Sequence, residues 1–342
     1  MTTMVDIAKR AGVALSTVSH TLSGNRPVSA EVKERVLKAM EELNYQPHAL
    51  GRALRNKRTR TIGMLYPSSA SGLSFSQLDF VSGAAEIATE RGYALYLWSA
   101  PNKDQEILRM AQQGLIDGLI LLEIKLQDSR ITMLKEHNYP FVMIGHAEEN
   151  EDISFVDLDF EYALRTSVEY LADQGHTNIA FINTNKALER GNGYAHRARW
   201  GFEQVVAELG LHGLHCACLP DAQSGYEFVS TLLADNPTIS GIITLNTWII
   251  GSIIRTINDR GLRIPDDYSL LGIMPPQVAE MMVPSVTAID FPYAQMGRMA
   301  AEMLIRQLDE ENAPITQTML RPSLTIRQST GLHLDRSKLE VY

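Results

Sequence analysis

The stretch AGVALSTVSHTLSG, residues 11–24, decides how the amino-terminal part of the chain folds. Gly12 gives a tight turn, and Leu15 to Leu22 have the pattern of a short helix with Val18 and Leu22 on one face. The other face carries hydroxyl groups and a histidine but few charges. Short hydroxyls fit the floor of a DNA groove, where long charged side chains would be crowded, but they also suit a small helix on the surface of an enzyme. Helix spacing alone leaves both interpretations open.

Two further helices flank this segment. Residues 4–11 form a first predicted helix that Gly12 ends, and residues 30–43 form a third, which Ser29 begins as N-cap. Two short helices joined by a tight turn and closed by a third make a helix-turn-helix unit. In such a unit the second helix enters the major groove and offers its first residues to the base edges.

Charge is segregated along the chain. The net charge is −9, yet residues 1–60 hold eleven Lys and Arg against five Asp and Glu, a net charge of +6, so that the remainder carries −15. A basic head on an acidic body indicates a polyanion as the partner of the head alone. This distribution favours DNA binding over the enzyme-surface interpretation of residues 11–24.

From Ile62 onward, strands and helices alternate. Buried-strand runs such as TIGMLYP (61–67) and GLILLEI (118–124) are each followed by an amphipathic segment. Strands that alternate with helices of this length predict parallel sheets with helices on both faces. Two successive series, the second ending at the strand 268–273, predict an α/β core of two doubly wound lobes. Ligands of such sheets bind outside the C-terminal ends of the strands, here between the lobes.

The chain is therefore expected to have four parts. Pro47 suits the first turn of a fourth short helix, 48–55, and the basic run 55–61 is typical of a linker. The expected parts are a small all-α headpiece at 1–46, a short helix and linker at 47–61, the two-lobed core at 62–331 and a tail at 332–342.

Several classes of function are disfavoured. The chain has no Gly-x-Gly-x-x-Gly after a strand, no phosphate-loop motif and no Gly-x-Ser-x-Gly elbow, so we expect neither an enzyme nor a cofactor. Cys216 and Cys218 stand close to His212 and His215, but reduced thiols are favoured over a metal site. No apolar run reaches the ~18–20 residues of a membrane span and no signal peptide opens the chain, which predicts a cytoplasmic protein.

The first fifty residues carry a specific resemblance. They contain, in order, DIA (6–8), AGV (11–13), TVS (17–19) and NYQP (44–47). In these motifs the chain resembles the lac repressor/galactose repressor family of bacterial transcriptional regulators, and GH (175–176) and PSVT (284–287) extend the resemblance to about Gly331. The resemblance implies a dimeric repressor of a pseudo-palindromic operator, bound to the nucleoid when on DNA. It also implies a core similar to periplasmic binding proteins, with a small metabolite, usually a sugar, in the cleft.

The resemblance assigns DNA contacts to the headpiece. Base-reading positions are occupied by Leu15, Ser16 and His20. Phosphate-contacting positions are occupied by Thr3, Thr17, Ser19, Ser29 and Tyr45. Residues 48–55 match the family's hinge helix, which pairs with its dimer mate in the minor groove, and its DNA-contacting residues are His48, Arg52, Leu54 and Arg55. Leu54 stands where the family inserts a leucine between base steps.

The resemblance also assigns an effector site to the cleft. Its residues are Phe75, Asp159, Arg197, Asn246 and Trp248. Asp157 is a rival of Asp159 if the register slips, and Arg199 is a rival of Arg197. An Asp and an Arg beside an aromatic side chain suit the vicinal hydroxyls of a carbohydrate.

The sequence departs from the family pattern at both sites. Ala14 replaces a serine that usually caps the recognition helix, and His20 replaces an arginine. Thr247 replaces an aspartate after Asn246, and Gly272 is followed by Ile-Met-Pro-Pro rather than by an aromatic residue and two aspartates. The ligand is therefore expected to be less polar, to be held differently, or not to be a plain hexose. The alternative function is a small-molecule sensor of the same fold with weak or altered DNA binding.

Overall fold

The computed structural model describes residues 2–23, 26–45, 58–67, 74–100 and 104–333. Its headpiece consists of α1 (Met4–Ala11), α2 (Leu15–Ser23) and α3 (Ala30–Glu42), so the three helices predicted there are present and end within one residue of their expected C-termini. Ile7, Val18 and Val36 are fully buried between them. The predicted helix 48–55 lies outside the described residues.

The turn between α1 and α2 has a defined structural basis. Gly12 adopts φ +64°, a left-handed conformation that an L side chain rarely takes. The Arg35 guanidinium of α3 donates to the carbonyls of Ala11 (2.8 Å) and Gly12 (3.1 Å). These bonds tie the turn to α3, and they fix the direction in which α2 leaves it.

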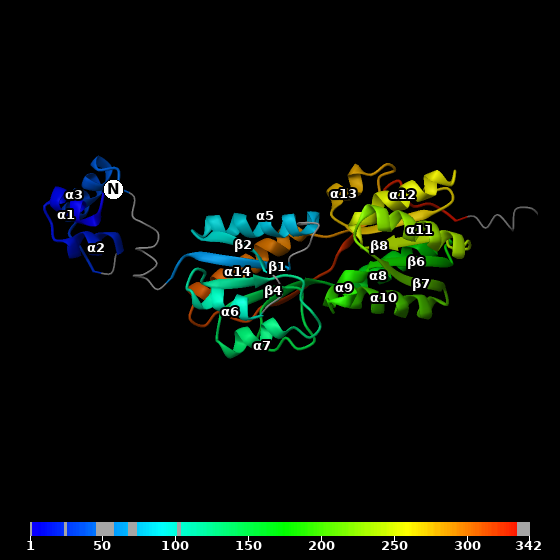
Figure 1. The fold of residues 1–342 in the computed structure, drawn as a ribbon, viewed down its shortest axis with the longest axis horizontal. Helices are drawn as coiled ribbons and strands as arrows, with labels where there is room; N and C mark the ends of the chain where they lie inside the picture. Colours follow the sequence, from blue (N-terminus) through cyan, green and yellow to red (C-terminus); the bar gives the residue numbers. More distant parts are fainter. Residues whose placement is uncertain (1, 24–25, 46–57, 68–73, 101–103, 334–342) are drawn as a thin grey trace, which may run out of the picture.

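The first lobe is built on a six-stranded sheet. Its order is β11-β5-β4-β3-β1-β2, and every pairing in it is parallel. The strands are β1 (Thr61–Pro67), β2 (Ala94–Ala100), β3 (Gly118–Leu121), β4 (Phe141–Ile144), β5 (Phe155–Leu158) and β11 (Gln317–Leu320). Helices α5 (Phe75–Glu90) and α14 (Tyr293–Asp309) cover one face, and α6 (Asp104–Gln112) and α7 (Ser129–Glu136) cover the other (Figure 1).

The second lobe repeats this design. Its sheet has the order β12-β10-β9-β8-β6-β7, parallel except for the β10–β12 pair. The strands are β6 (Asn178–Thr184), β7 (His212–Cys218), β8 (Gly241–Thr244), β9 (Ser269–Met274), β10 (Thr287–Asp290) and β12 (Ser323–Thr325). Helices α8 (Phe160–Asp173) and α10 (Gly193–Leu209) pack on one face, and α11 (Ala222–Asp235) and α12 (Ile250–Asp259) pack on the other. Two short helices, α9 (Asn185–Glu189) and α13 (Pro276–Met281), complete it.

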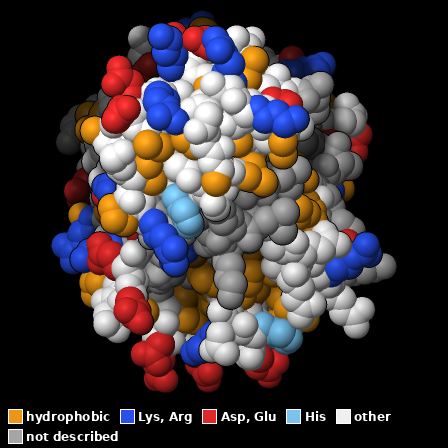
Figure 2. Space-filling model, turned by 90° about the vertical axis from the view of Figure 1, so that its left-hand side faces the viewer, with side chains coloured by type: hydrophobic (Ala, Val, Ile, Leu, Met, Phe, Trp, Pro, Cys, Tyr) orange, Lys and Arg blue, Asp and Glu red, His pale blue; other side chains and the backbone are white. Residues whose placement is uncertain are grey.

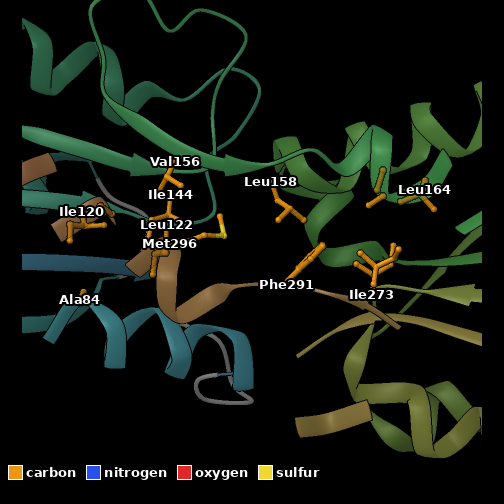
Figure 3. Packing of buried hydrophobic residues seen from close by; sticks show 14 of the residues in the cluster. Ala84, Ile120, Leu122, Ile144, Val156, Leu158, Leu164, Ile273, Phe291 and Met296 are labelled. Carbon is orange, nitrogen blue, oxygen red and sulfur yellow. The ribbon is translucent and has the colours of Figure 1, made fainter. Parts of the chain in front are cut away.

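The lobes are not two successive stretches of sequence, as the strand–helix series suggested. In the described part the chain crosses between them three times: from β5 to α8, from β10 to α14, and from β11 to β12. Helix α14 and strand β11 thus return to the first lobe. One apolar cluster runs through these crossings, and Figure 3 shows Leu158, Phe291 and Ile273 within it, between the interiors of the two lobes.

Helices α5 and α14 approach each other very closely. A Cβ atom at Gly83 would overlap the backbone carbonyl of Ala294, and one at Gly297 would overlap that of Phe80. Both glycines are therefore required for this contact. Because α14 begins at a lobe crossing, the contact fixes one side of the interlobe region.

The part of the chain that the structure describes contains neither a membrane-spanning helix nor a cluster of metal ligands. Among those residues, no helix is long and apolar enough to cross a bilayer. The same residues contain no group of three or more His, Cys, Asp or Glu placed to hold a metal ion. Burial raises the pKa of the Cys216 thiol to about 12 and that of Cys218 to about 11, so both are protonated at neutral pH.

Candidate DNA-binding surface and interlobe cavity

The second helix of the headpiece presents its first turn to solvent. Leu15 is 47% exposed although it is a large apolar residue, and Ser16 beside it is exposed as well. Val18, one turn on, is fully buried in the headpiece core. Thr17, Ser19 and His20 are half-buried. An exposed leucine next to hydroxyls is a surface able to meet a thymine methyl and polar base edges.

The side chains of the other residues predicted to contact DNA differ in their hydrogen bonds and packing within the protein. Ser29 is the N-cap residue of α3, is exposed, and makes no side-chain capping bond. Thr3 is the N-cap of α1, and its hydroxyl donates to Asp6 Oδ2 at 2.7 Å. Tyr45 packs against the headpiece core. His48, Arg52, Leu54 and Arg55 lie outside the described residues. The DNA-contacting roles of all these residues stay predictions.

Charged side chains are mixed on this end of the molecule. Figure 2 views the protein from its headpiece end and shows Lys and Arg among acidic and apolar side chains. At the base of the linker, Arg58 and Arg60 lie 3.1 and 3.6 Å from the carboxylate of Asp309, the last residue of α14. The backbone N–H groups of Thr59 and Arg60 donate to Asp117. The linker is therefore fastened to the first lobe where β1 begins.

A cavity of about 230 Å³ lies between the lobes. Its walls come from the C-terminal ends of strands in both sheets and from the crossing segments, as expected for doubly wound sheets. Most of the wall is apolar or aromatic. Its polar groups include Glu123, Asp157, Lys186, Arg190, Asn192 and Asn246.

The cavity contains only some of the residues that sequence analysis places in it. Asn246 and Trp248 line it, and Trp248 is 40% exposed. Phe75 is not part of the wall: as the first residue of α5 it points to solvent and is 54% exposed, while its neighbours Ser74 and Ser76 line the cavity. The effector role of Asn246 and Trp248 stays a prediction.

The predicted aspartate and arginine are also engaged elsewhere. Asp159 is the N-cap of α8 and accepts from the backbone N–H of Tyr162 at 2.8 Å, whereas its rival Asp157 lines the cavity. Asp157 in turn accepts from His146 Nδ1 at 2.7 Å. Arg197 is buried and donates to the carbonyls of His146 and Ala147, outside the cavity wall. Arg199 lies on the surface and pairs with Glu203.

Glu123 is the polar centre of the cavity and was missed by sequence analysis. Its carboxylate accepts from Gln77 Nε2 of the first lobe at 2.8 Å and from Asn192 Nδ2 of the second at 3.2 Å, and Arg190 lies 3.6 Å away. Burial raises the pKa of Glu123, although Arg190 and Asn192 counteract this. The carboxylate therefore links the two lobes directly. Its place two residues after the C-terminal end of β3 is the signal that could have identified it.

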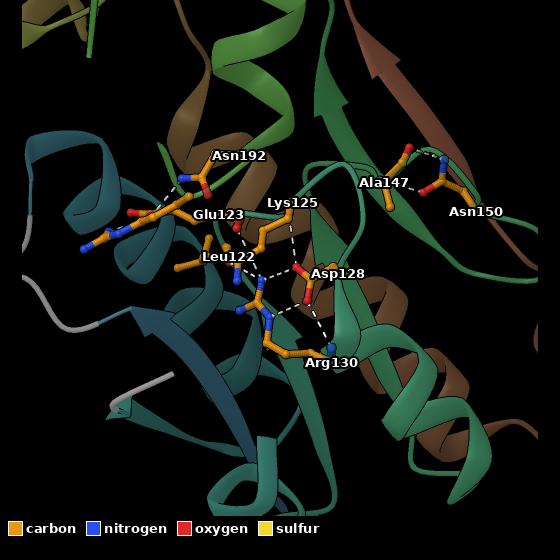
Figure 4. A network of polar contacts seen from close by, with 9 residues as sticks. Leu122, Glu123, Lys125, Asp128, Arg130, Ala147, Asn150 and Asn192 are labelled. Atoms are coloured by element: carbon orange, nitrogen blue, oxygen red, sulfur yellow. Dashed lines mark hydrogen bonds and ion pairs between the residues drawn. The ribbon is translucent and has the colours of Figure 1, made fainter. Parts of the chain in front are cut away.

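The loop after β3 is supported by a buried ion pair (Figure 4). Arg130 Nε and Nη2 donate to the two carboxylate oxygens of Asp128 at 2.8 and 2.6 Å. Nη2 also donates to the carbonyls of Leu122 and Glu123. This pair holds Glu123 in a left-handed conformation, φ 51°.

Backbone bonds continue the connection between the lobes. The N–H of Gly193 donates to the carbonyl of Ile124 at 2.8 Å, and that of Leu126 donates to Gly191 at 2.9 Å. The loops 122–128 and 190–193 thus form a bridge beside the cavity. Residues from both sides of this bridge, among them Glu123 and Asn192, line the cavity.

The arrangement is that of a ligand-sensing DNA-binding regulator: a helix-turn-helix headpiece on a two-lobed body with a cavity at the lobe junction. Comparisons with known proteins agree. The model for bacterial regulatory proteins of the lacI family matches residues 3–48, and the model for the periplasmic binding protein-like domain matches residues 168–330. The HTH-type transcriptional repressor PurR of Erwinia tasmaniensis is 30% identical over 97% of this chain and 97% of that protein. The chain belongs to the lacI family of bacterial transcriptional regulators.

Solved structures share the fold. The Lac repressor dimer bound to operator and the anti-inducer ONPF has a TM-score of 0.85 and 22% identity, over 96% of this chain and 99% of that one. The complex of the transcriptional regulator CelR with cellobiose has a TM-score of 0.71 and 24% identity, over 96% and 100%. The resemblance noted in the sequence motifs and the predicted fold class are therefore confirmed, and a regulator rather than an enzyme is supported by these relatives.

Proposed function

We propose that the protein is a repressor that binds a pseudo-palindromic operator as a homodimer and changes its operator affinity when a small metabolite occupies the interlobe cavity. The observation that carries this proposal is the exposed first turn of α2, where Leu15 and Ser16 face solvent on a compact helix-turn-helix unit. The operator bound by the similar Lac repressor dimer supports it. Such a regulator acts in the bacterial cytoplasm, on the nucleoid when bound to DNA.

The effector is proposed to act on the angle between the lobes. The cavity wall includes Tyr293 and Met296 at the start of α14, and the same helix ends at Asp309, which pairs with Arg58 and Arg60 of the linker. A helix of 17 residues is about 25 Å long. Helix α14 therefore joins the cavity to the base of the linker as one rigid element. A coupling of ~1–3 kcal/mol between effector and DNA is typical of such two-state systems.

The effector class follows from the cavity and from related proteins. The similar CelR binds cellobiose, which supports a carbohydrate or a carbohydrate derivative as the effector here. The cavity combines a mostly apolar wall with a few placed polar groups, which is typical of small-ligand sites.

The DNA-binding role is tested on a duplex that the full chain selects from random sequence. Leu15→Ala should weaken binding to this duplex by about 2 kcal/mol, since it removes the apolar atoms that contact a base, at ~0.8 kcal/mol for each buried carbon, and should weaken binding to random duplex much less. Leu37→Ala is the matched control because Leu37 is similarly exposed, at 49%, on α3 of the same headpiece. Equal losses for both variants, or no duplex selected at all, would overturn the proposal.

A further inference from the structure

Five aromatic rings form a continuous series along the cavity. Ring centroids are 5.2 Å apart for Phe80–Tyr293, 5.1 Å for Tyr293–Phe291, 5.3 Å for Phe291–Phe160 and 5.6 Å for Phe160–Tyr194. All five residues line the cavity. We call this series, Phe80, Tyr293, Phe291, Phe160 and Tyr194, the aromatic wall.

The aromatic wall belongs to the segments that connect the lobes. Phe160 follows β5 at one crossing, and Phe291 and Tyr293 follow β10 at another. Phe80 lies on α5 of the first lobe, and Tyr194 lies on α10 of the second. A ligand held against these rings therefore contacts both lobes and two of their connections. Aromatic rings bind other rings in offset or edge-to-face geometry at such distances.

A buried hydrogen-bond acceptor without a partner in the described part of the chain belongs to a residue of the cavity wall, Asn246. Asn246 is 2% exposed, and its Nδ2 faces the carbonyls of Cys218 and Leu219, at 3.5 and 3.4 Å. These two carbonyls fix the orientation of the amide, because only the nitrogen can donate to them. The buried Oδ1 atom has no hydrogen-bond partner among the described residues. A buried acceptor of this kind gains a bond only if the ligand brings a donor.

The hydroxyl-binding groups expected for a plain sugar are not assembled here. Arg197 is held by the carbonyls of His146 and Ala147, and Asp159 caps α8. The carboxylates that do line the cavity, Asp157 and Glu123, already accept hydrogen bonds from protein groups on both of their oxygens. The cavity therefore offers a large aromatic surface, and neither of these carboxylates has an oxygen without a protein donor.

We propose that the effector is a small molecule in which an aromatic ring is joined to a sugar, such as an aryl glycoside or a nucleoside. The ring packs on the aromatic wall, and a sugar hydroxyl or ring amine donates to Asn246 Oδ1. This proposal rests on the proposed function for the meaning of the cavity, and it names the ligand class of that site.

Binding of matched pairs to the full chain, measured by isothermal titration calorimetry, tests the proposal. The pairs are phenyl β-D-glucopyranoside with methyl β-D-glucopyranoside, and adenosine with methyl β-D-ribofuranoside. In at least one pair, the aromatic member should bind at least tenfold more tightly than its partner, and the pair that does so identifies the source of the ring. Phe160→Leu should reduce this preference severalfold. Trp200→Leu is the control and should leave it unchanged, because Trp200 is 44% exposed on α10 and does not line the cavity.

The outcomes are decisive for this proposal and separate from those for DNA binding. Equal or tighter binding of the methyl glycosides, or no binding of either aromatic compound at millimolar concentration, would overturn it. The wild-type comparison decides the question even if Phe160→Leu does not fold. If plain sugars bind and change operator affinity, the proposed function stands and the aromatic effector fails. If the aromatic compounds bind but the chain selects no duplex, the reverse holds.

Discussion

Replacing Arg130 by methionine should destabilise the first lobe by about 3 kcal/mol, toward the lower end of the range for breaking a buried ion pair. The side chain of Asp128 is 1% exposed and that of Arg130 is 10% exposed, so the variant leaves a carboxylate buried without its cation. The backbone N–H groups of Lys125 and Arg130 still donate to it, which is why we expect the lower end. Urea unfolding of the full chain at pH 7, followed by circular dichroism, measures the loss.

Three comparisons separate this explanation from a general loss of packing. Arg199→Met should cost less than about 1 kcal/mol, since the Arg199–Glu203 pair is almost half exposed on both sides. The double variant Asp128→Asn/Arg130→Met should recover most of the loss, because no charge is then left buried.

Burial alone would raise the pKa of Asp128, but the bonds from Arg130 outweigh it and keep the pKa below its usual value. The stability that Arg130 provides is therefore present above about pH 4 and declines at lower pH. The reasoning is refuted if Arg130→Met costs no more than Arg199→Met.

Four further predictions follow from other parts of the structure. Gly297→Ala should destabilise the protein by about 1–3 kcal/mol because its Cβ would overlap the carbonyl of Phe80, whereas Gly251→Ala, in open space on α12, should be neutral or slightly stabilising in the same urea titration. His176 is 2% exposed, and burial lowers its pKa to about 4. Because the folded state disfavours the protonated ring, the free energy of unfolding should be highest above pH 6.5 and should fall by about 3 kcal/mol as the pH decreases toward 4. A His176→Gln variant should lack this decline. Ala14→Ser should raise the free energy of unfolding of the headpiece by about 1 kcal/mol, because Ala14, which precedes α2, has no side-chain oxygen to accept from the first N–H groups of the helix; an unchanged melting curve would contradict this. Asp309→Asn should reduce the effector-dependent change in DNA affinity by ~0.5–2 kcal/mol while ligand affinity measured without DNA is unchanged.

The headpiece could be predicted from the sequence because its structure is local. Val18 and Leu22 recur at helical spacing within one short segment, and Gly12 marks the turn. The alternation of strands and helices likewise predicted two doubly wound lobes. Sequence analysis assigned no helix to 293–309, although Met296, Ala300, Leu304 and Leu308 recur at intervals of four on the face that is buried in the structure.

The cavity was harder to predict because tertiary contacts decide which side chains face it. Arg197 and Asp159 have the chemistry of a sugar site, but a pair of carbonyls and a helix N-terminus take up their polar groups. Phe160 and Phe291 are 131 positions apart in sequence, yet their rings meet at 5.3 Å because two lobe crossings run side by side. No pattern in one segment could indicate this contact.

The central claim is that the basic amino-terminal part, residues 1–60, binds double-stranded DNA, and salt dependence tests it most directly. The full chain is titrated against a labelled duplex from the region upstream of its own coding sequence, and fluorescence anisotropy gives the affinity at 50 and at 200 mM salt. Each phosphate contact contributes about −0.9 to the slope of log K against log salt, so two contacts alone lower the affinity roughly tenfold over this fourfold rise in salt. We predict that the affinity falls by more than this. An affinity that does not change with salt, or no binding at 50 mM, would contradict the account.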